Sequence, residues 1–363
     1  MSVEMKSDLA SIVDSFIDPN SGRSLAEAKV VKQLELDGNK VFIKLCLGYP
    51  ADNYIPELRQ ELLKKLVTVS ADINIELDIS WEVTARKVQP GVKAFDHIKN
   101  VIAVASGKGG VGKSTTTVNL ALALAKDGAR VGVLDADIYG PSQPRMLGIT
   151  GQPESADGKT MEPMEAHGVQ AMSIGFLVDD ENPMIWRGPM VTQALEQLLR
   201  DTNWKDLDYL LIDMPPGTGD VQLTLSQKIP VTGAVIVTTP QDIALLDARK
   251  GLKMFEKVNV NVLGIVENMS THICSNCGHE EHIFGAGGGQ RMAQDYNIDL
   301  LGSLPLELSI RENADNGNPS VVAEPEGSAA KAYTGIARKV AAKLALQSKE
   351  YSSKFPNIVI QNT

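Results

Sequence analysis

The chain has 363 residues, of which 43% are hydrophobic and 22% charged, as expected of an ordinary globular protein with room for two domains. Its formal net charge of −10 disfavours a protein that coats nucleic acid, and three cysteines are too few for a disulfide framework. The sequence has no apolar run of about 18 residues, and its acidic, amphipathic start does not have the pattern of a secretory signal. We therefore expect a cytoplasmic protein that binds neither nucleic acid nor a membrane.

Residues 1–88 carry patterns of a small α+β domain. The predicted elements are a helix at 7–17, strands at 29–36 and 41–47, a helix at 55–69 and a strand at 72–83. The pair Pro90-Gly91 interrupts regular structure, so we predict a linker at residues 89–100.

Strand and helix patterns alternate through the second predicted domain, residues 101–347. Near-continuous apolar runs occur at 101–106, 131–137, 209–214, 233–239, 261–269 and 300–306. Such runs are typical of strands buried on both faces, and they predict an α/β fold with a doubly wound, mostly parallel sheet. Ligands of such sheets bind beyond the carboxyl ends of the strands. Polar residues stand at or near four of these ends: Asp137, Asp213, Asp242 and Asn268. Residues 348–363 are interpreted as a polar C-terminal tail.

The segment SGKGGVGKSTTTVNL after the first of these runs predicts a phosphate-binding loop. It matches G-x-x-x-x-G-K-[ST], and a predicted helix at 115–126 follows it. Glycines let backbone N–H groups turn toward an anion, Lys113 neutralises the β- and γ-phosphates, and Ser114 offers its hydroxyl to Mg²⁺. The predicted ATP-binding residues of this loop are Gly107, Lys108, Gly109, Gly110, Val111, Gly112, Lys113, Ser114 and Thr115. The pattern alone assigns no role to the additional lysine, Lys108.

Aspartates at two strand ends are candidates for the chemistry of ATP hydrolysis. Asp213 precedes a Pro-Pro-Gly-Thr-Gly loop, and a carboxylate there can hold the Mg²⁺ shell directly or through water. Asp135 and Asp137 end another strand, where one carboxylate can orient a water molecule while the other is structural.

Cys274 and Cys277 form a C-x-x-C pair, a pattern typical of a redox pair, half of a metal site or two buried small residues. Two thiolates do not complete a tetrahedral metal site. Four ligands arise with His279 and His282, which gives zinc within one chain, or from two chains across a twofold axis, which suits zinc or an iron–sulfur cluster. The spacing does not decide between a zinc site within one chain and a metal site shared by two chains.

Taken together, the motifs resemble those of a known family. The early lysine, the D-x-D strand end and the D-x-PPGTGD loop are similar to those of the deviant Walker A ATPases, which include MinD, ParA and nitrogenase iron protein. Within that group, SGKGGVGKST, DADIYGPSQPRMLG, IDMPPGTGD, CSNCG and LGSLPLE resemble the Mrp/ApbC iron–sulfur carriers. The resemblance implies a P-loop NTPase fold and a homodimeric, slow ATPase that carries a 4Fe–4S cluster to apo-proteins.

The same resemblance implies roles for particular residues. Lys108 would be the signature lysine that reaches the phosphates in the partner's site, and Asp137 would position the attacking water. With Lys113, these two make up the predicted catalytic set. Asp213 would serve the Mg²⁺ shell, and Asn268 would contact the adenine.

The cysteines and the partners follow by the same resemblance. Cys274 and Cys277 of each subunit would bridge the cluster, and the expected partners are apo iron–sulfur proteins and cluster assembly scaffold proteins. Residues 1–88 resemble the SufT-like assembly domain but lack its Cys-Pro, so partner docking is the expected role of this domain. The alternatives are a positioning ATPase of the MinD/ParA type and a zinc-stabilised regulatory scaffold.

Overall fold

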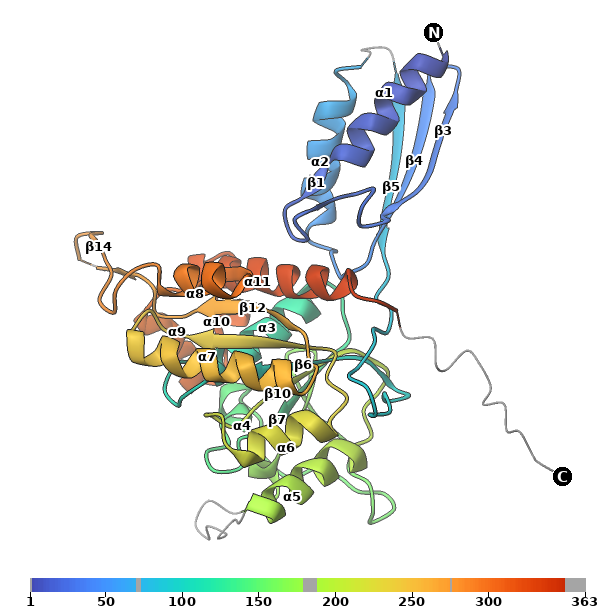
Figure 1. The fold of residues 1–363 in the computed structure, drawn as a ribbon. Coiled ribbons are helices and arrows are strands. Elements are labelled where there is room, and N and C mark those ends of the chain that lie inside the picture. Colours follow the sequence, from blue (N-terminus) through green and yellow to red (C-terminus); the bar gives the residue numbers. More distant parts are fainter. Residues whose placement is uncertain (1, 70–72, 179–187, 275, 350–363) are drawn as a thin grey trace, which may run out of the picture.

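The structure is a computed structural model that describes residues 2–69, 73–178, 188–274 and 276–349. These residues form a small N-terminal domain that stands on a larger α/β domain (Figure 1). The predicted tail lies outside the described residues, apart from residues 348–349, which pair with residues 86–87. Within the described ranges, no helix has the length and apolarity to cross a membrane.

The small domain packs two helices on one side of a three-stranded sheet (Figure 1). Its elements are α1 (Ser2–Ser15), β1 (Ile17–Asp18), β2 (Arg23–Ser24), β3 (Val31–Asp37), β4 (Lys40–Leu47), α2 (Ile55–Leu66) and β5 (Asn74–Trp81). The order is β3-β4-β5, with β3 antiparallel and β5 parallel to β4. Alternate residues of β4 are buried, because successive side chains of a strand point to opposite faces. The helix expected at 7–17 begins earlier, at Ser2.

The large domain alternates strands and helices. Its elements are β6 (Ile98–Ala105), α3 (Lys113–Lys126), β7 (Val131–Asp135), α4 (Gln143–Met146), β8 (Met164–Ala166), β9 (Val169–Ser173), η1 (Ile174–Phe176), α5 (Gly188–Asp201), β10 (Leu207–Asp213), α6 (Asp220–Lys228), β11 (Gly233–Thr238), α7 (Asp242–Lys257), β12 (Val262–Glu267), β13 (His272–Ile273), β14 (Glu280–Glu281), α8 (Gly288–Tyr296), β15 (Leu300–Ser303), α9 (Leu308–Asp315), α10 (Ser320–Ala323) and α11 (Ser328–Ala345).

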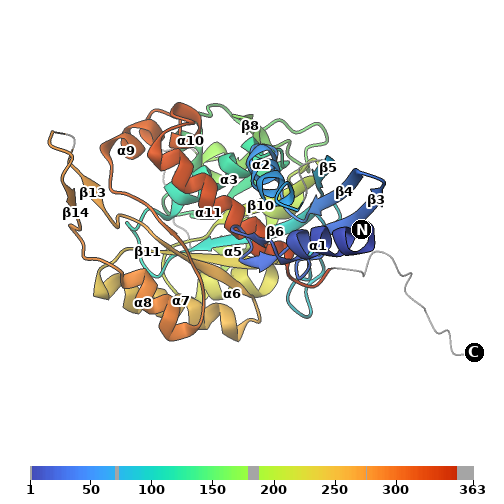
Figure 2. The same ribbon diagram turned by 90° about the horizontal axis from the view of Figure 1, so that it is seen from above.

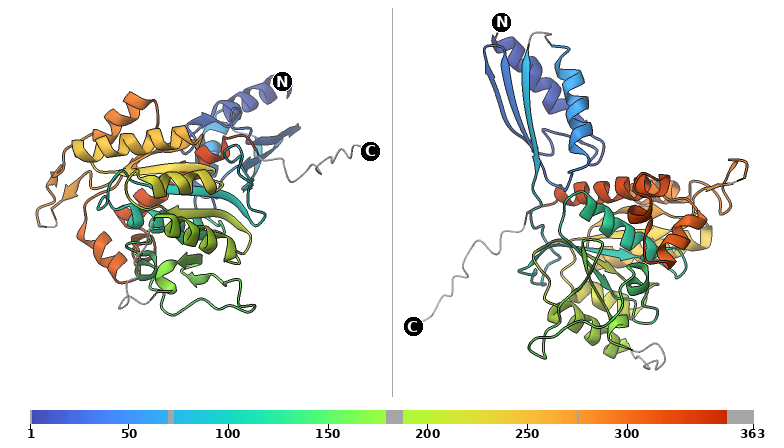
Figure 3. Two further views of the ribbon diagram at one scale, coloured as in Figure 1. Left: turned by 60° about the horizontal axis from the view of Figure 1, so that its bottom comes forward. Right: turned by 180° about the vertical axis from the view of Figure 1, so that it is seen from behind.

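Eight strands form one sheet in the order β15-β12-β11-β6-β10-β7-β9-β8, and only the edge strand β8 runs antiparallel to its neighbour. Helices α3 and α11 pack on one face of this sheet, and α5, α6 and α7 on the other (Figures 2 and 3). Burial on both faces explains the near-continuous apolar runs of the central strands. The predicted doubly wound, mostly parallel sheet is confirmed.

The linker between the domains is shorter than the predicted segment, residues 89–100. Strand β6 begins at Ile98, so residues 98–100 belong to the sheet. Gln89 is buried, and its amide donates a hydrogen bond to the carbonyl oxygen of Ser226 on α6 at 2.9 Å. A Pro-Gly pair marks a break in regular structure, but it does not indicate whether the chain beyond it packs on a neighbouring helix.

The small domain docks where α3 ends. The backbone N–H of Asp52 donates to the carbonyl oxygen of Asp127 at 3.1 Å. Arg338 of α11 pairs with the buried Asp127 carboxylate at 2.6 Å, and its guanidinium lies 5.4 Å from the Tyr54 ring. Because α3 begins at Lys113, the helix that starts in the phosphate loop ends against the small domain.

Candidate functional site

The predicted phosphate loop connects the carboxyl end of β6 to α3, at the edge of the sheet where such sheets bind ligands. Gly112 has a left-handed φ of 81°, and a Cβ there would lie 2.1 Å from the Asn268 side-chain nitrogen. A Cβ on Gly107 would lie 2.1 Å from the Asp247 carbonyl carbon on α7. Only glycine fits both positions, so these two glycines let the loop pack closely against α7 and Asn268.

Lys113, in the first turn of α3, is buried beside two acidic strand ends. Its ammonium lies 2.6 Å from Asp213 Oδ1 and 3.9 Å from Asp137 Oδ2. It also donates to the Ser114 hydroxyl at 3.2 Å. The structure thus brings together four of the predicted site residues from three segments of the chain, in the donor set expected for a nucleotide with Mg²⁺.

Asp135 lies directly opposite Asp213 on the neighbouring strand and is fully buried. Four donors bond its carboxylate at 2.9–3.2 Å: the backbone N–H groups of Asp137, Ser142 and Gln143 and the hydroxyl of Ser173. Burial, with the nearby Asp213 charge, raises the pKa of Asp135 to about 7. The geometry makes Asp135 the structural member of the D-x-D pair, holding the loop that presents Asp137.

Asp137 is more open than Asp135, with 15% of its side chain exposed. Partial burial raises its pKa above the usual value, and the neighbouring Lys113 charge opposes that rise. A carboxylate in this position has access to water and a buried cation beside it. Asp137 therefore fits the role of orienting a water molecule better than Asp135 does.

The remaining predicted nucleotide-binding residues differ in their surroundings. Asn268 is buried against the loop, donating to the Val111 carbonyl oxygen at 2.9 Å. Thr115 is half-buried in the first turn of α3, whereas Gly109 and Gly110 are exposed. Lys108 is half-buried, and within the described part of the chain its ammonium makes no hydrogen bond or ion pair.

Two further residues of this site were not anticipated from the sequence. Thr117 donates to Asp213 Oδ1 at 3.1 Å, and the Gln143 amide donates to Asp213 Oδ2 at 3.1 Å. Thr117 follows Lys113 by one helical turn, a spacing that could have indicated it. Gln143 lies in the segment DADIYGPSQPRMLG, but no spacing there indicated a contact, because it reaches the site from the start of α4, eight residues beyond Asp135.

Cys274 and Cys277 lie between the short strands β13 and β14, in a hairpin at the periphery of the large domain (Figure 1). Cys274 is partly exposed and Cys277 is exposed. The backbone N–H groups of Asn276 and Cys277 hold the pKa of the Cys274 thiol below its usual value. Thiolates are the metal-binding form of cysteine, so this environment suits a metal ligand.

The flanking histidines do not complete a site with these thiols. His282 Nδ1 lies 2.9 Å from the Ser270 carbonyl oxygen, and His279 Nε2 lies 3.9 Å from Glu281 Oε1. In the portions of the chain that the structure describes, no three His, Cys, Asp or Glu residues are grouped to hold a metal ion. The zinc site expected as one alternative, with Cys274, Cys277, His279 and His282 in one chain, is therefore not assembled here.

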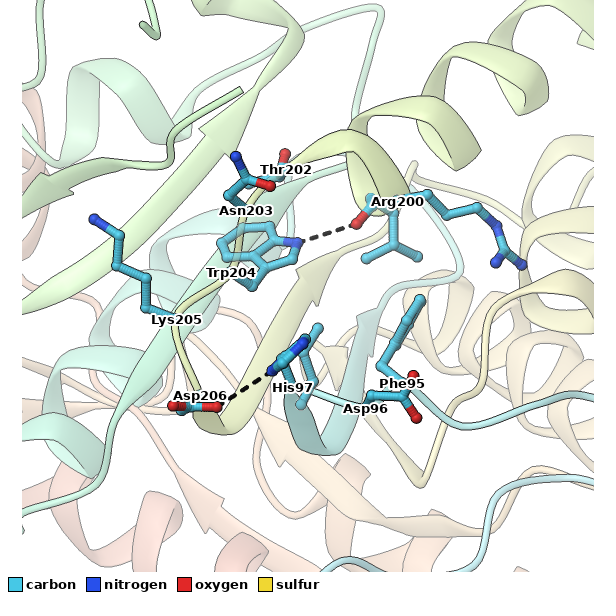
Figure 4. Close-up of a pocket in the computed structure, with 11 residues that line it drawn as sticks. Phe95, Asp96, His97, Arg200, Thr202, Asn203, Trp204, Lys205 and Asp206 are labelled. Carbon is cyan, nitrogen blue, oxygen red and sulfur yellow. Dashed lines mark hydrogen bonds and ion pairs between the residues drawn. The ribbon is translucent and has the colours of Figure 1, made fainter. Parts of the chain in front are cut away.

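A pocket of about 470 Å³ lies at the opposite edge of the sheet, where β6 and β10 begin (Figure 4). Trp204 lines it and donates to the Leu199 carbonyl oxygen at 3.1 Å, and His97 faces Asp206 at 3.3 Å. This pocket contains none of the predicted site residues and is separate from the phosphate loop.

Comparisons with known proteins identify the family. The family described as NUBPL iron-transfer P-loop NTPase matches residues 97–341, and the one described as iron-sulfur cluster assembly protein matches residues 8–77. The chain belongs to the NUBPL iron-transfer P-loop NTPase family. The resemblance to the iron–sulfur carriers, with an assembly domain in front, is confirmed.

Relatives in this family are similar over most of their length. The chain is 50% identical over 346 residues to the iron-sulfur cluster carrier protein of Escherichia coli K12, covering 95% of this chain and 94% of the relative. It is 55% identical over 257 residues to the iron-sulfur cluster transfer protein NUBPL of Mus musculus, covering 70% of this chain and 81% of the relative.

Two solved structures support the P-loop NTPase fold. A nucleotide-binding protein from Archaeoglobus fulgidus, solved in complex with ADP, is 40% identical, with a TM-score of 0.56, and the match covers 64% of this chain and 90% of that one. The cell division ATPase MinD of Pyrococcus furiosus is 24% identical, with a TM-score of 0.51 and coverages of 66% and 98%. The likeness to MinD shows the fold alone.

Proposed function

We propose that the protein is an ATP-hydrolysing iron–sulfur carrier that binds a 4Fe–4S cluster between two copies of the chain and delivers it to apo-proteins. The observation that carries the proposal is the contrast between a phosphate loop whose Lys113 is buried against Asp213 and an exposed cysteine hairpin with only two ligands among the described residues. The relatives named as cluster carriers and as a transfer protein support the same cargo.

The number of ligands favours two chains. Each hairpin supplies two thiols, and no third ligand from the described residues lies with them. A twofold axis through the hairpin would bring four thiolates together, the set that a 4Fe–4S cluster takes. An exposed cluster between two hairpins is also accessible to a recipient protein, as cluster transfer requires. We infer that cluster assembly scaffold proteins load the same surface.

The phosphate loop supplies the nucleotide chemistry of the proposal. Ser114 and Asp213 would hold Mg²⁺, which neutralises phosphate charge when it is bound. Lys113 would leave Asp213 for the β- and γ-phosphates, and Asp137 would orient the attacking water molecule. Lys108, whose ammonium has no partner within the described residues, would act in the site of the partner subunit.

Nucleotide state would then control the cluster through the way the two subunits pack. A ligand shifts an equilibrium only by binding its two states with different affinity. Lys108 provides that difference, because it would contact phosphate only in the state in which the two loops face each other. ATP would therefore stabilise one arrangement of the two hairpins, and hydrolysis of ATP would remove that stabilisation.

Anaerobic reconstitution of the full chain with iron and sulfide tests this function. We expect about four irons per dimer and the absorption of a 4Fe–4S cluster in the wild type. Cys274→Ala should lose both, whereas Cys46→Ala, in β4 of the small domain, should retain both. About one zinc per chain in the wild type, or full iron loading in Cys274→Ala, would overturn the proposal.

A further inference from the structure

Gln143 joins three parts of the candidate nucleotide site. The residue begins α4 and is 1% exposed. Its side-chain nitrogen donates to the Ser114 carbonyl oxygen and to Asp213 Oδ2, both at 3.1 Å. Its backbone N–H donates to Asp135 Oδ2 at 3.0 Å. One residue thus connects the phosphate loop, the end of β10 and the loop that carries Asp137.

The two oxygens of Asp213 are held by different donors. Lys113 and Thr117 donate to Oδ1 at 2.6 and 3.1 Å, whereas Gln143 donates to Oδ2. A lysine that moves to a phosphate group would leave Oδ1 bonded to Thr117, and the bond from Gln143 to Oδ2 would remain. Gln143 and Thr117 would therefore hold the plane of the Asp213 carboxylate while Lys113 changes partner.

The Gln143 side-chain oxygen, Oε1, is buried and has no hydrogen-bond partner among the described residues. Buried amide oxygens are nearly always paired, so this one calls for a donor that the protein does not supply. The amide nitrogen of the same group bonds the Ser114 backbone carbonyl and Asp213 Oδ2, and these are the two residues that would hold Mg²⁺. A water molecule of the metal shell would supply the missing donor.

We propose that Gln143 is a positioning residue of the nucleotide site: its nitrogen orients Asp213, and its oxygen accepts a hydrogen bond from a water molecule bound beside Ser114. This role rests on the proposed nucleotide function. It predicts that Gln143 contributes to the binding of Mg²⁺ with nucleotide and contributes little to the binding of nucleotide alone.

Calorimetric titration of ADP, with and without Mg²⁺, tests the role directly. Gln143→Leu keeps the volume of the side chain and removes both polar atoms. We expect it to reduce the Mg²⁺-dependent gain in ADP affinity about 10-fold, the effect of one hydrogen bond to a charged group, and to change metal-free ADP affinity by less than about 2-fold. The matched control is Gln222→Leu, because Gln222 on α6 is equally buried and both of its amide atoms are unpaired.

Two results would overturn the inference: a wild-type Mg²⁺ effect in Gln143→Leu, or an equal loss of ADP affinity with and without the metal. These are binding measurements, so they decide the role of Gln143 even if the wild type does not hydrolyse ATP. Absence of hydrolysis in the wild type would refute the proposed ATPase activity, and the role of Gln143 would still be judged on affinity.

Discussion

The phosphate loop and the cysteine hairpin differ in how much of each site one chain supplies. At the loop, Lys113, Asp135 and Asp213 are buried and bonded to one another or to neighbouring backbone. At the hairpin, Cys277 is exposed, and the two thiols have no third ligand among the described residues. The loop holds its charges in place before any ligand arrives, whereas the hairpin presents ligands that need a second set.

The difference reflects what each site would bind. Most of the residues that would bind a nucleotide come from one chain, and the structure already groups them where the strands end, which limits the reorganisation that binding requires. A cluster that passes between proteins must remain accessible, and an exposed hairpin with few side-chain contacts provides that access. In the absence of nucleotide, we expect substitutions at one site to leave ligand binding at the other unchanged. The following predictions concern both sites and are given in order of decreasing effect.

The largest effect should come from the loop lysine. Lys113→Ala should lower ATP affinity about 10³-fold, the scale of losing one partner of a buried charge pair. Lys108→Ala should keep the nucleotide affinity of a single subunit but slow hydrolysis, because Lys108 would reach the phosphates only in the site of the partner subunit. Equilibrium titration measures nucleotide affinity, phosphate release measures hydrolysis, and iron analysis measures cluster loading. Iron loading should be unchanged in both variants. Equal losses of nucleotide affinity in the two variants would contradict the division of roles.

A smaller effect is expected from the water-positioning carboxylate. Asp137→Asn should retain nucleotide and lower turnover about 10²-fold, since a group that orients water acts mainly in the transition state. Steady-state phosphate release with saturating ATP measures this loss. Asp135→Asn should slow turnover less than Asp137→Asn does. The reverse order would show that the wrong carboxylate was assigned to water.

The raised pKa of Asp135 should instead be measurable in the pH dependence of the free energy of unfolding. Its folded pKa of about 7 lies above the value of about 4 in an unfolded chain, so the folded state binds the extra proton between these values. The contribution of protonated Asp135 to the free energy of unfolding is therefore complete below about pH 4 and is lost as pH rises toward 7. We expect the stability of wild type relative to Asp135→Asn to fall by about 1 kcal/mol per pH unit between pH 5 and 6.5.

Urea unfolding of both proteins across this range measures the difference, and the contributions of titrating groups far from Asp135 cancel between the two proteins. A stability gap that widens with pH would mean that the four hydrogen bonds to Asp135 outweigh burial and depress its pKa.

The smallest effect should come from the histidines of the hairpin. A double variant, His279→Ala with His282→Ala, should load iron as the wild type does, because a cluster bound by four thiolates needs neither ring. Loss of the contact between His282 and the Ser270 carbonyl should cost about 1 kcal/mol of stability. Loss of half or more of the iron would favour a mixed-ligand site and contradict the proposed bridge.

Local patterns were sufficient for the elements that carry the site. The apolar runs predicted β6, β7, β10, β11, β12 and β15, because strands buried on both faces need apolar side chains at nearly every position. The glycine and lysine spacing predicted the loop, and the pair Pro90-Gly91 predicted a break in regular structure between two domains. The linker prediction was too long at its carboxyl end, because residues 98–100 pair in β6.

Contacts between distant segments could not be predicted in this way. Asp135 and Asp213 are 78 positions apart, and only strand order places β7 beside β10 and makes their carboxylates neighbours. Gln143 reaches Ser114 and Asp213 across 29 and 70 positions, a distance in sequence that no local pattern encodes.

The sequence by itself determined the composition of the two sites: a phosphate loop with two lysines, a strand-end aspartate before PPGTGD, and a pair of cysteines. The tertiary structure alone decided which groups are buried together, and hence that Asp135 has a raised pKa, that Gln143 bonds Asp213, and that no histidine of the described residues completes a metal site with the two thiols. The reason is physical: residue type and spacing set what a side chain can donate or accept, whereas burial and long-range packing set which partner it meets.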